Sequence, residues 1–152
     1  MRRMLIVWAI LLIGLASGCD RHRDHDDSPT PDCGALVGGG GAASVEFTFV
    51  PAYGSFDDLQ GQVQHVIPAG YQIAAYINVD GEWWIKPYDD ERTTAINCDG
   101  TFTIDITTGG IDEEATSIVA YVIPITFDPP LSYDEDVLNA NSVTHAQVDR
   151  GP

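Results

Sequence analysis

The chain has 152 residues, of which 23 are acidic and seven are basic, and its formal net charge is −16. So acidic a chain is repelled by nucleic acid and by anionic lipid head groups, which argues strongly against a nucleic-acid-binding role. The length suits a single domain of ordinary size.

The first 18 residues have the layout of an export signal. Arg2 and Arg3 give a positive start, Met4 to Ile13 carries no charge, and small residues follow. The apolar stretch is too short to span a bilayer, which needs about 20 residues. Residues 1–18 are therefore predicted to be a signal peptide.

The end of this segment, Leu15-Ala16-Ser17-Gly18-Cys19, resembles the lipobox of bacterial lipoproteins. The resemblance implies that cleavage leaves Cys19 first in the mature chain, and that diacylglycerol and an acyl chain such as palmitate are attached to it. Two or three chains anchor a protein stably where one would not. We therefore expect a protein anchored by lipid on Cys19 in a bacterial cell membrane and facing away from the cytoplasm, on the periplasmic or the cell-surface side. The alternative is an ordinary signal peptide cut near Ala16 or Gly18.

Residues 19–43 are predicted to be a flexible acidic and glycine-rich tether. They hold few large apolar side chains and include the glycine run Gly38 to Gly41, so they cannot bury enough surface to fold. A tether of this length would reach roughly 25–30 Å. His22 and His25 could ligate a divalent metal, but nothing pre-organises them, so a solvated spacer is favoured.

From Ser44 onward the pattern is typical of β-structure. Short runs rich in Val, Ile, Tyr, Phe and Thr are bounded by Gly, Pro and Asp clusters. Strands are expected near 44–50, 59–67, 71–79, 83–88, 93–98, 102–107, 116–124 and 142–149. Ile118 to Ile123 is apolar at both alternating positions, which predicts a central strand. The fold class is all-β, a single antiparallel sandwich of about seven or eight strands over residues 44–150.

Alternation also predicts the register of the hairpin after residue 79. A three-residue loop at 80–82 pairs Ile77 with Ile85, whereas a two-residue turn at Asp80-Gly81 would pair Ile77 with Trp84. The first choice matches apolar with apolar and is favoured. It places Trp83 in the core and Trp84 outside.

Two cysteines remain once Cys19 is assigned to lipid. Cys33 and Cys98 form an even pair in a compartment that permits disulfides, so they are candidates for a bond. The alternative is that Cys98 is a buried small apolar residue. In the hairpin at Asp99-Gly100, a three-residue loop would pair Cys98 with Phe102 and Ile96 with Ile104.

An outward Trp84 has aromatic company. Tyr76 and Tyr88 fall on the same alternating positions, and so does Lys86. Exposed aromatic faces can stack on sugar rings while polar groups read the hydroxyls, so Trp84, Tyr88, Tyr76 and Lys86 form a candidate glycan-binding set. The alternatives are that Trp84 packs under a loop or contacts a protein.

Signals of other chemistry are weak. Asp112-Glu113-Glu114 offers oxygen ligands but matches no calcium loop, so an acidic surface loop is favoured, as it is at Asp57-Asp58 and Asp89 to Glu91. The domain has two histidines, His65 and His145, and no nucleophile elbow. No catalytic residue, metal site or cofactor is predicted, and the chain is not expected to be an enzyme.

Five segments of the folded part form a recognisable set: Phe49 to Ser55, Leu59 to Val63, Trp83 to Pro87, Asp99 to Phe102 and Ile106 to Gly110. As a set they resemble an Ig-like accessory domain of bacterial secreted proteins, often found beside glycoside hydrolases. The resemblance covers about residues 45–150, and Asn141 to Arg150 looks like the last strand. It implies an Ig-like β-sandwich and no catalytic residue.

Together these features predict a lipid-anchored, non-enzymatic binding or interaction module outside the cytoplasm, whose partner is a glycan or an envelope protein. The alternative is a purely structural envelope lipoprotein with no small-molecule ligand.

Overall fold

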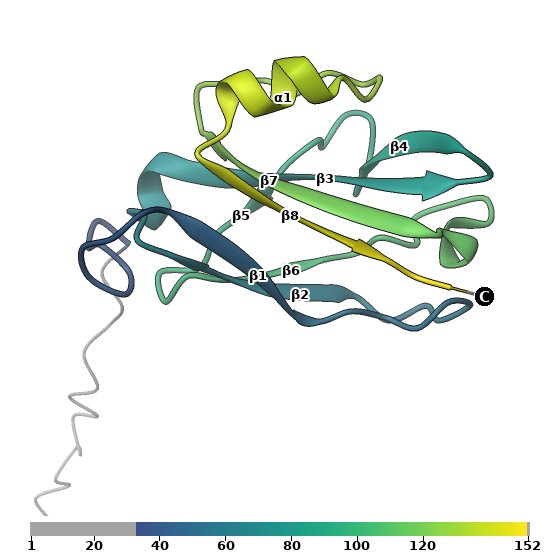
Figure 1. The fold of residues 1–152 in the computed structure, drawn as a ribbon, viewed down its shortest axis with the longest axis horizontal. Helices are drawn as coiled ribbons and strands as arrows, with labels where there is room; N and C mark the ends of the chain where they lie inside the picture. Colours follow the sequence, from purple (N-terminus) through teal and green to yellow (C-terminus); the bar gives the residue numbers. More distant parts are fainter. Residues whose placement is uncertain (1–32, 152) are drawn as a thin grey trace, which may run out of the picture.

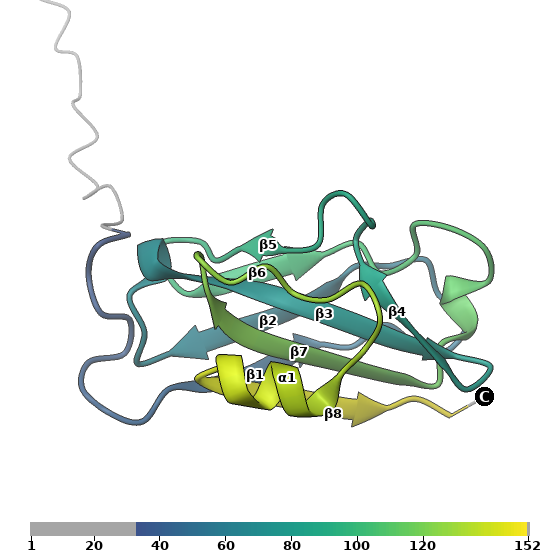
Figure 2. The ribbon, with the colours of Figure 1, turned by 90° about the horizontal axis from the view of Figure 1, so that it is seen from above.

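The computed structural model describes residues 33–151, and the predicted signal peptide and Cys19 lie outside them. The described chain forms two antiparallel sheets packed face to face, with one short α-helix outside the larger sheet (Figure 1). Seen from above, the helix lies over the β7–β8 side of that sheet and runs roughly along its strands (Figure 2). The all-β sandwich predicted from the sequence is confirmed.

The smaller sheet has three strands in the order β1-β2-β6. These are β1 (Ser44–Phe49), β2 (Leu59–Gln64) and β6 (Thr101–Ile104). Gly61 of β2 is needed because a Cβ at this position would collide with the ring of Phe102 on the neighbouring strand. The small sheet thus packs its strands closely at the centre.

The larger sheet has the order β4-β3-β7-β8, and β5 pairs with β3 beside β4. Its strands are β3 (Tyr71–Val79), β4 (Glu82–Lys86), β5 (Thr94–Ala95), β7 (Ser117–Pro124) and β8 (Thr144–Asp149). Single 3-10 turns, η1 (Pro68–Gly70) and η2 (Asp112–Glu114), precede β3 and β7. Each of the eight expected strands is present, with ends that differ by up to three residues.

The main core fills the space between the sheets. Its buried side chains alternate along each strand, as in Ile73, Ala75 and Ile77 of β3 and Ile118, Ala120 and Val122 of β7. Strand β7 lies between β3 and β8 and is buried on both faces, so its predicted central place is confirmed.

A second core lies on the outer face of the larger sheet, and the sequence pattern did not predict it. The residues that follow β7 fold back over this face and end in helix α1 (Glu135–Asn141), whose first turn is capped by the Asp134 carboxylate accepting from the Val137 N–H at 3.0 Å. Leu138 of α1 is fully buried against Tyr76 and Tyr121. No helix within residues 33–151 is long and apolar enough to cross a bilayer.

The register predicted for the β3–β4 hairpin is wrong. The turn has two residues, Asp80 (φ 52°) and Gly81 (φ 85°), and Ile77 pairs with Trp84. Asp-Gly suits such a turn because both positions need positive φ. Matching apolar residues across the ladder could not select the register. Strand β3 is buried on both faces, so it offers apolar partners to β4 with either a two-residue or a three-residue turn.

The register predicted at the second turn is wrong as well. The turn was expected to be closed by Cys98 and Phe102, but the residues joined across it are Asn97 and Thr101, where the Asn97 N–H donates to the Thr101 carbonyl at 2.8 Å. Strand β5 forms its ladder with β3. The disulfide between Cys33 and Cys98 is present. Cys98 is only partly buried, so the alternative of a buried apolar residue does not describe it.

Residues 33–43, predicted to belong to the tether, are bonded to the sandwich. The Val37 N–H donates to the Val66 carbonyl at 3.0 Å, and the His65 N–H donates to the Val37 carbonyl at 2.7 Å. The His65 ring also bonds to the Gly39 carbonyl at 2.8 Å. The glycine run can follow the domain closely because Gly38 and Gly39 adopt positive φ. Residues 33–43 therefore belong to the folded domain, and not to a tether.

Candidate functional site

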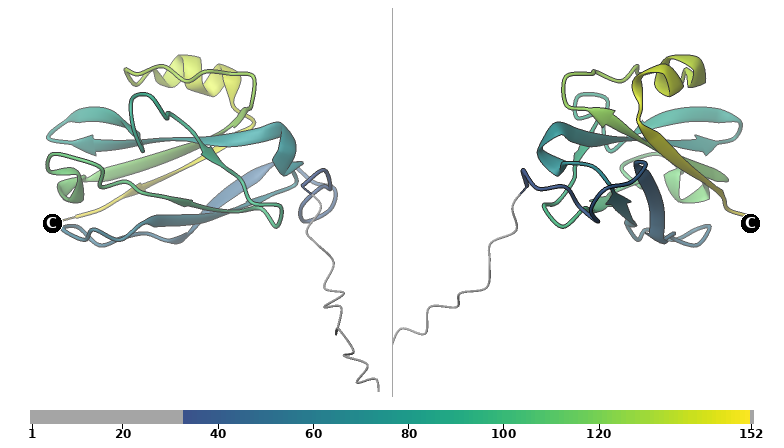
Figure 3. Two further views of the ribbon diagram at one scale, coloured as in Figure 1. Left: turned by 180° about the vertical axis from the view of Figure 1, so that it is seen from behind. Right: turned by 60° about the vertical axis from the view of Figure 1, so that its left-hand side comes forward.

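The candidate site is a cleft of about 640 Å³ beneath the edge strand β4, which we call the Trp84 cleft. It exists because the smaller sheet places no strand beneath β4, and the loop that follows β6 takes that position. Figure 3 shows from behind that this loop and the tip of the β3–β4 hairpin lie at the same end of the sandwich. The lining residues are Val79, Asp80, Glu82, Trp84 to Asp90 and Thr108 to Asp112.

Trp84 faces this cleft because its partner across the ladder, Ile77, points into the core between the sheets. Side chains directly opposite in a ladder lie on the same face, so Trp84 points the same way but beyond the edge of the small sheet. It is 52% exposed, and Tyr88 is 48% exposed. The backbone of Trp84 also forms a bridge to Ser132, which covers part of the free edge of β4.

Trp83 points the other way. Its ring stacks on that of Tyr133, with centroids 4.6 Å apart and planes 21° from parallel, and it packs on the second core. Trp84 is exposed as expected, but the core that receives Trp83 is the outer one and not the one between the sheets.

Two members of the candidate glycan-binding set are not available at the surface. Tyr76 is fully buried beneath the covering segment, and its hydroxyl donates to the Pro130 carbonyl at 2.6 Å. It pairs with Ile85 and so lies on the face opposite to Trp84. Lys86 lies on the same face as Trp84 but is only 6% exposed. The exposed positions expected for Tyr76 and Lys86 are therefore wrong, because Tyr76 lies in a second core and Lys86 is held in a buried ion pair at the inner side of the cleft.

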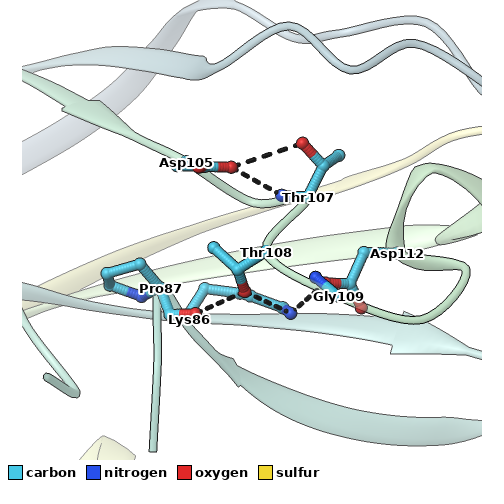
Figure 4. Close-up of polar contacts among 7 residues, drawn as sticks. All are labelled: Lys86, Pro87, Asp105, Thr107, Thr108, Gly109 and Asp112. Carbon is cyan, nitrogen blue, oxygen red and sulfur yellow. Dashed lines mark hydrogen bonds and ion pairs between the residues drawn. The ribbon is translucent and has the colours of Figure 1, made fainter. Parts of the chain in front are cut away.

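The Lys86 ammonium is paired with the Asp112 carboxylate at the buried side of the cleft (Figure 4). It also donates to the Thr108 hydroxyl at 3.1 Å, and that hydroxyl donates to the Pro87 carbonyl at 2.5 Å. The Gly109 N–H donates to the same Asp112 carboxylate at 2.9 Å. These bonds fix the loop after β6 to β4, and they make Asp112 a structural group, not the solvated loop residue that the sequence suggested.

The rim of the cleft is acidic. Asp80, Glu82, Asp89 and Asp90 are exposed, and none of them has an ion-pair partner among residues 33–151. Two backbone hydrogen bonds between Tyr88 and Glu91, of 3.4 and 3.2 Å, close the loop that carries Asp89 and Asp90.

Sequence reasoning missed the rim carboxylates and Ile111 as parts of one site. Asp89 and Asp90 had been discounted as one acidic pair among many, and the loop at 107–112 gives no pattern that predicts where it lies. The alternation that placed Trp84 and Tyr88 on one face was the available signal.

Within residues 33–151, neither a clustered set of metal ligands nor a histidine lines the cleft. Residues 33–151 hold no group of three His, Cys, Asp or Glu side chains arranged to bind a metal ion. His65 is bonded to Gly39 and the His145 ring packs on Tyr121 at 5.0 Å, so neither lines the cleft. What the cleft offers chemically is aromatic surface beside carboxylate hydrogen-bond acceptors.

Comparisons with known protein families, with curated proteins and with solved structures find no match to this chain. The class that can be stated is that of a two-sheet antiparallel β-sandwich with an aromatic, acidic cleft under one edge strand.

Proposed function

We propose that this protein is a lipid-anchored, non-enzymatic binding module of the bacterial cell envelope, and that the Trp84 cleft binds a carbohydrate. The observation that carries the proposal is the pair of half-exposed aromatic side chains, Trp84 and Tyr88, in one cleft. Its volume of about 640 Å³ falls in the range of small-ligand sites, about 300–1,000 Å³.

The chemistry of the lining suits a sugar. The apolar face of a pyranose ring can stack on an indole or phenol ring, and its hydroxyls need acceptors at the rim. Such acceptors are supplied by Asp80, Glu82, Asp89 and Asp90. They take the role of contacting sugar hydroxyls that the sequence analysis assigned to Lys86. Sugar hydroxyls can donate hydrogen bonds as well as accept them, so a neutral sugar can bind to these carboxylates through its hydroxyl groups.

The position of the cleft suits a module that is tethered at its other end. Residues 33–43 lie at one end of the sandwich, and the β3–β4 turn and the loop at 107–112 lie toward the opposite end (Figure 1). A chain anchored ahead of Cys33 would leave the cleft facing away from the membrane. The resemblance to Ig-like accessory domains names no ligand, so the carbohydrate proposal rests on the lining of the cleft.

The binding proposal is tested with the full chain, purified in detergent, on a glycan array. We expect binding of at least one oligosaccharide, lost by tenfold or more in Trp84→Ala, because stacking on this ring supplies much of the contact. The matched control is Phe56→Ala, which removes an aromatic side chain that is 71% exposed and outside the cleft. No binding to any glycan would contradict the proposal and favour the structural alternative, an envelope lipoprotein without a ligand.

The anchor is tested separately through Cys19. We expect Cys19→Ser to block processing or to release the protein from the membrane fraction, because a serine hydroxyl cannot take the place of the lipid-bearing thiol. Metabolic labelling with an alkyne-tagged fatty acid gives the direct readout. A Cys19→Ser protein that is cleaved as before and still membrane-bound would contradict the anchor and leave the cleft proposal untouched.

A further inference from the structure

The charge of the cleft narrows the class of sugar. Five carboxylates line it, and its one cation, Lys86, is paired with Asp112. Four carboxylates therefore face solvent without a positive partner in the lining. A second hollow of about 350 Å³ shares Asp90 with the cleft and adds the exposed Glu91. Arg92 and Asp128 also line that hollow and pair with each other, so Asp90 and Glu91 are its carboxylates without an ion-pair partner in the lining.

The rest of the described chain offers no free positive group to offset this rim. Residues 33–151 hold three basic side chains, Lys86, Arg92 and Arg150. Arg92 is paired with Asp128, with the two atoms 3.1 Å apart. Arg150 is buried and donates to the Ala115 and Pro51 carbonyls at 3.0 and 3.1 Å. Lys86 and Arg92 are paired with carboxylates, and Arg150 is buried outside the cleft lining, so the field at the rim of the cleft is negative.

This field excludes one kind of sugar and favours another. A uronate or a sulfated sugar would be repelled. A protonated amine would be attracted by the carboxylates, and it would also interact favourably with the π-face of Trp84 or Tyr88. The carboxylates lie at both ends of the lining, Asp80 and Glu82 beside the β3–β4 turn and Asp89 and Asp90 after β4.

From the aromatic lining and this charge, which is complementary to a cation, we infer that the cleft binds an oligosaccharide whose rings carry protonated amines. A repeated positive charge matches carboxylates spaced along the cleft and its neighbouring hollow better than a single charge does. The inference rests on the proposed function and names the substrate class of the same site.

The test uses three β-1,4-linked pentasaccharides that differ only at C2 of each ring, where they carry an amine, an acetamide or a hydroxyl. Calorimetry with the full chain in detergent at pH 6, where the amines are protonated, compares them at 50 and 500 mM salt. We expect the amine form to bind about tenfold tighter than the hydroxyl form at 50 mM salt, as a few exposed ion pairs would provide. At 500 mM salt the advantage falls to about twofold or less because of screening.

Charge-neutral variants assign the preference to the cleft. Asp89→Asn with Asp90→Asn removes most of the preference for the amine form and leaves the hydroxyl form within twofold. The matched control, Asp57→Asn with Asp58→Asn, removes the same charge outside the cleft and leaves the preference unchanged. Trp84→Ala weakens the binding of all three sugars.

The outcomes separate the inference from the proposed function. Equal binding of the three sugars overturns the inference and keeps the carbohydrate proposal, whereas binding of none overturns both. Two results overturn the inference in favour of plain cation binding. One is an amine form that binds Trp84→Ala as well as the native chain, and the other is a lysine pentapeptide that binds as tightly as the amine sugar.

Discussion

Two neighbouring tryptophans on β4 have opposite surroundings. Trp83 stacks on Tyr133 beneath the segment that leads into α1, whereas Trp84 is half exposed above the loop after β6. The two residues have the same side chain and belong to the same strand. What differs is the cover on each side of the sheet.

The outer side of the larger sheet is closed by chain that follows β7. The inner side is closed by the smaller sheet except under β4, where a loop held by the Lys86–Asp112 pair takes the place of a strand. Exposure of an aromatic residue at a sheet edge is therefore decided by the extent of the opposing layer, and less by the strand's own sequence. The missing strand beneath β4 also leaves the space that forms the Trp84 cleft.

The largest expected effect comes from breaking the ion pair on the open side. Asp112→Leu leaves the Lys86 ammonium buried without its partner and should lower the free energy of unfolding by about 3–5 kcal/mol. Chemical denaturation followed by tryptophan fluorescence measures the loss.

The control for this pair is the double variant Lys86→Met with Asp112→Leu, which removes both charges. It should recover at least half of the loss, because a buried pair replaced by apolar groups is often close to neutral. A single variant that loses less than about 1 kcal/mol would mean that the loop is held to β4 by other contacts.

The covered side is tested by Leu138→Ala in α1. Leu138 is fully buried in the second core, so its truncation should cost about 3 kcal/mol. Val137→Ala, at the neighbouring and 39% exposed position, should change stability by less than about 0.5 kcal/mol. Similar losses for the two variants would show that α1 does not close this face.

Much of the sandwich could be predicted from the sequence because strands and turns leave local patterns. The eight strands and the central place of Ile118 to Ile123 were expected and are present, and the Cys33–Cys98 bond is the one of two alternatives that the structure shows. Prolines and glycines mark the ends of these strands directly.

The cover of the outer face could not be predicted in the same way. Helix α1 has only seven residues, too short to display helical periodicity, so the sequence gives no sign of a layer over the outer face of β3. Without that layer, apolar matching favoured the wrong register at Ile77, and Tyr76 was expected to be exposed. The cleft itself depends on the Lys86–Asp112 contact, which joins residues 26 apart in the chain and has no local pattern.

The tryptophans themselves give a smaller and more direct test of the comparison. Trp83→Ala should lose about 2 kcal/mol, less than a fully buried aromatic would, because its ring is only partly covered. Trp84→Ala should lose less than about 0.5 kcal/mol in stability. If Trp84→Ala were the more destabilising change, Trp84 would be a packing residue and the cleft would lose its binding surface.

A modest effect is expected for Tyr76→Phe at pH 8, and its dependence on pH is distinctive. The Phe variant loses the hydrogen bond to the Pro130 carbonyl, which should cost about 1 kcal/mol at pH 8. Burial raises the pKa of Tyr76 well above its ordinary value of 10.0, and burial followed by the Tyr133 hydroxyl does the same for the pKa of Tyr121.

A raised folded-state pKa contributes stability that is fully present below the unfolded pKa and is lost as the pH rises above it. Above pH 10 the unfolded chain releases the Tyr76 proton and the folded chain retains it, so the native protein loses stability that the Phe variant does not lose. The difference between the two proteins should therefore shrink from about 1 kcal/mol at pH 8 toward zero near pH 11, by up to about 1.4 kcal/mol per pH unit. Urea denaturation at pH 8, 10 and 11 measures it, with Tyr121→Phe as the parallel variant. A difference that stays constant over this range would mean that water reaches Tyr76, and that the outer face of the sheet is not closed as the Trp83 side requires.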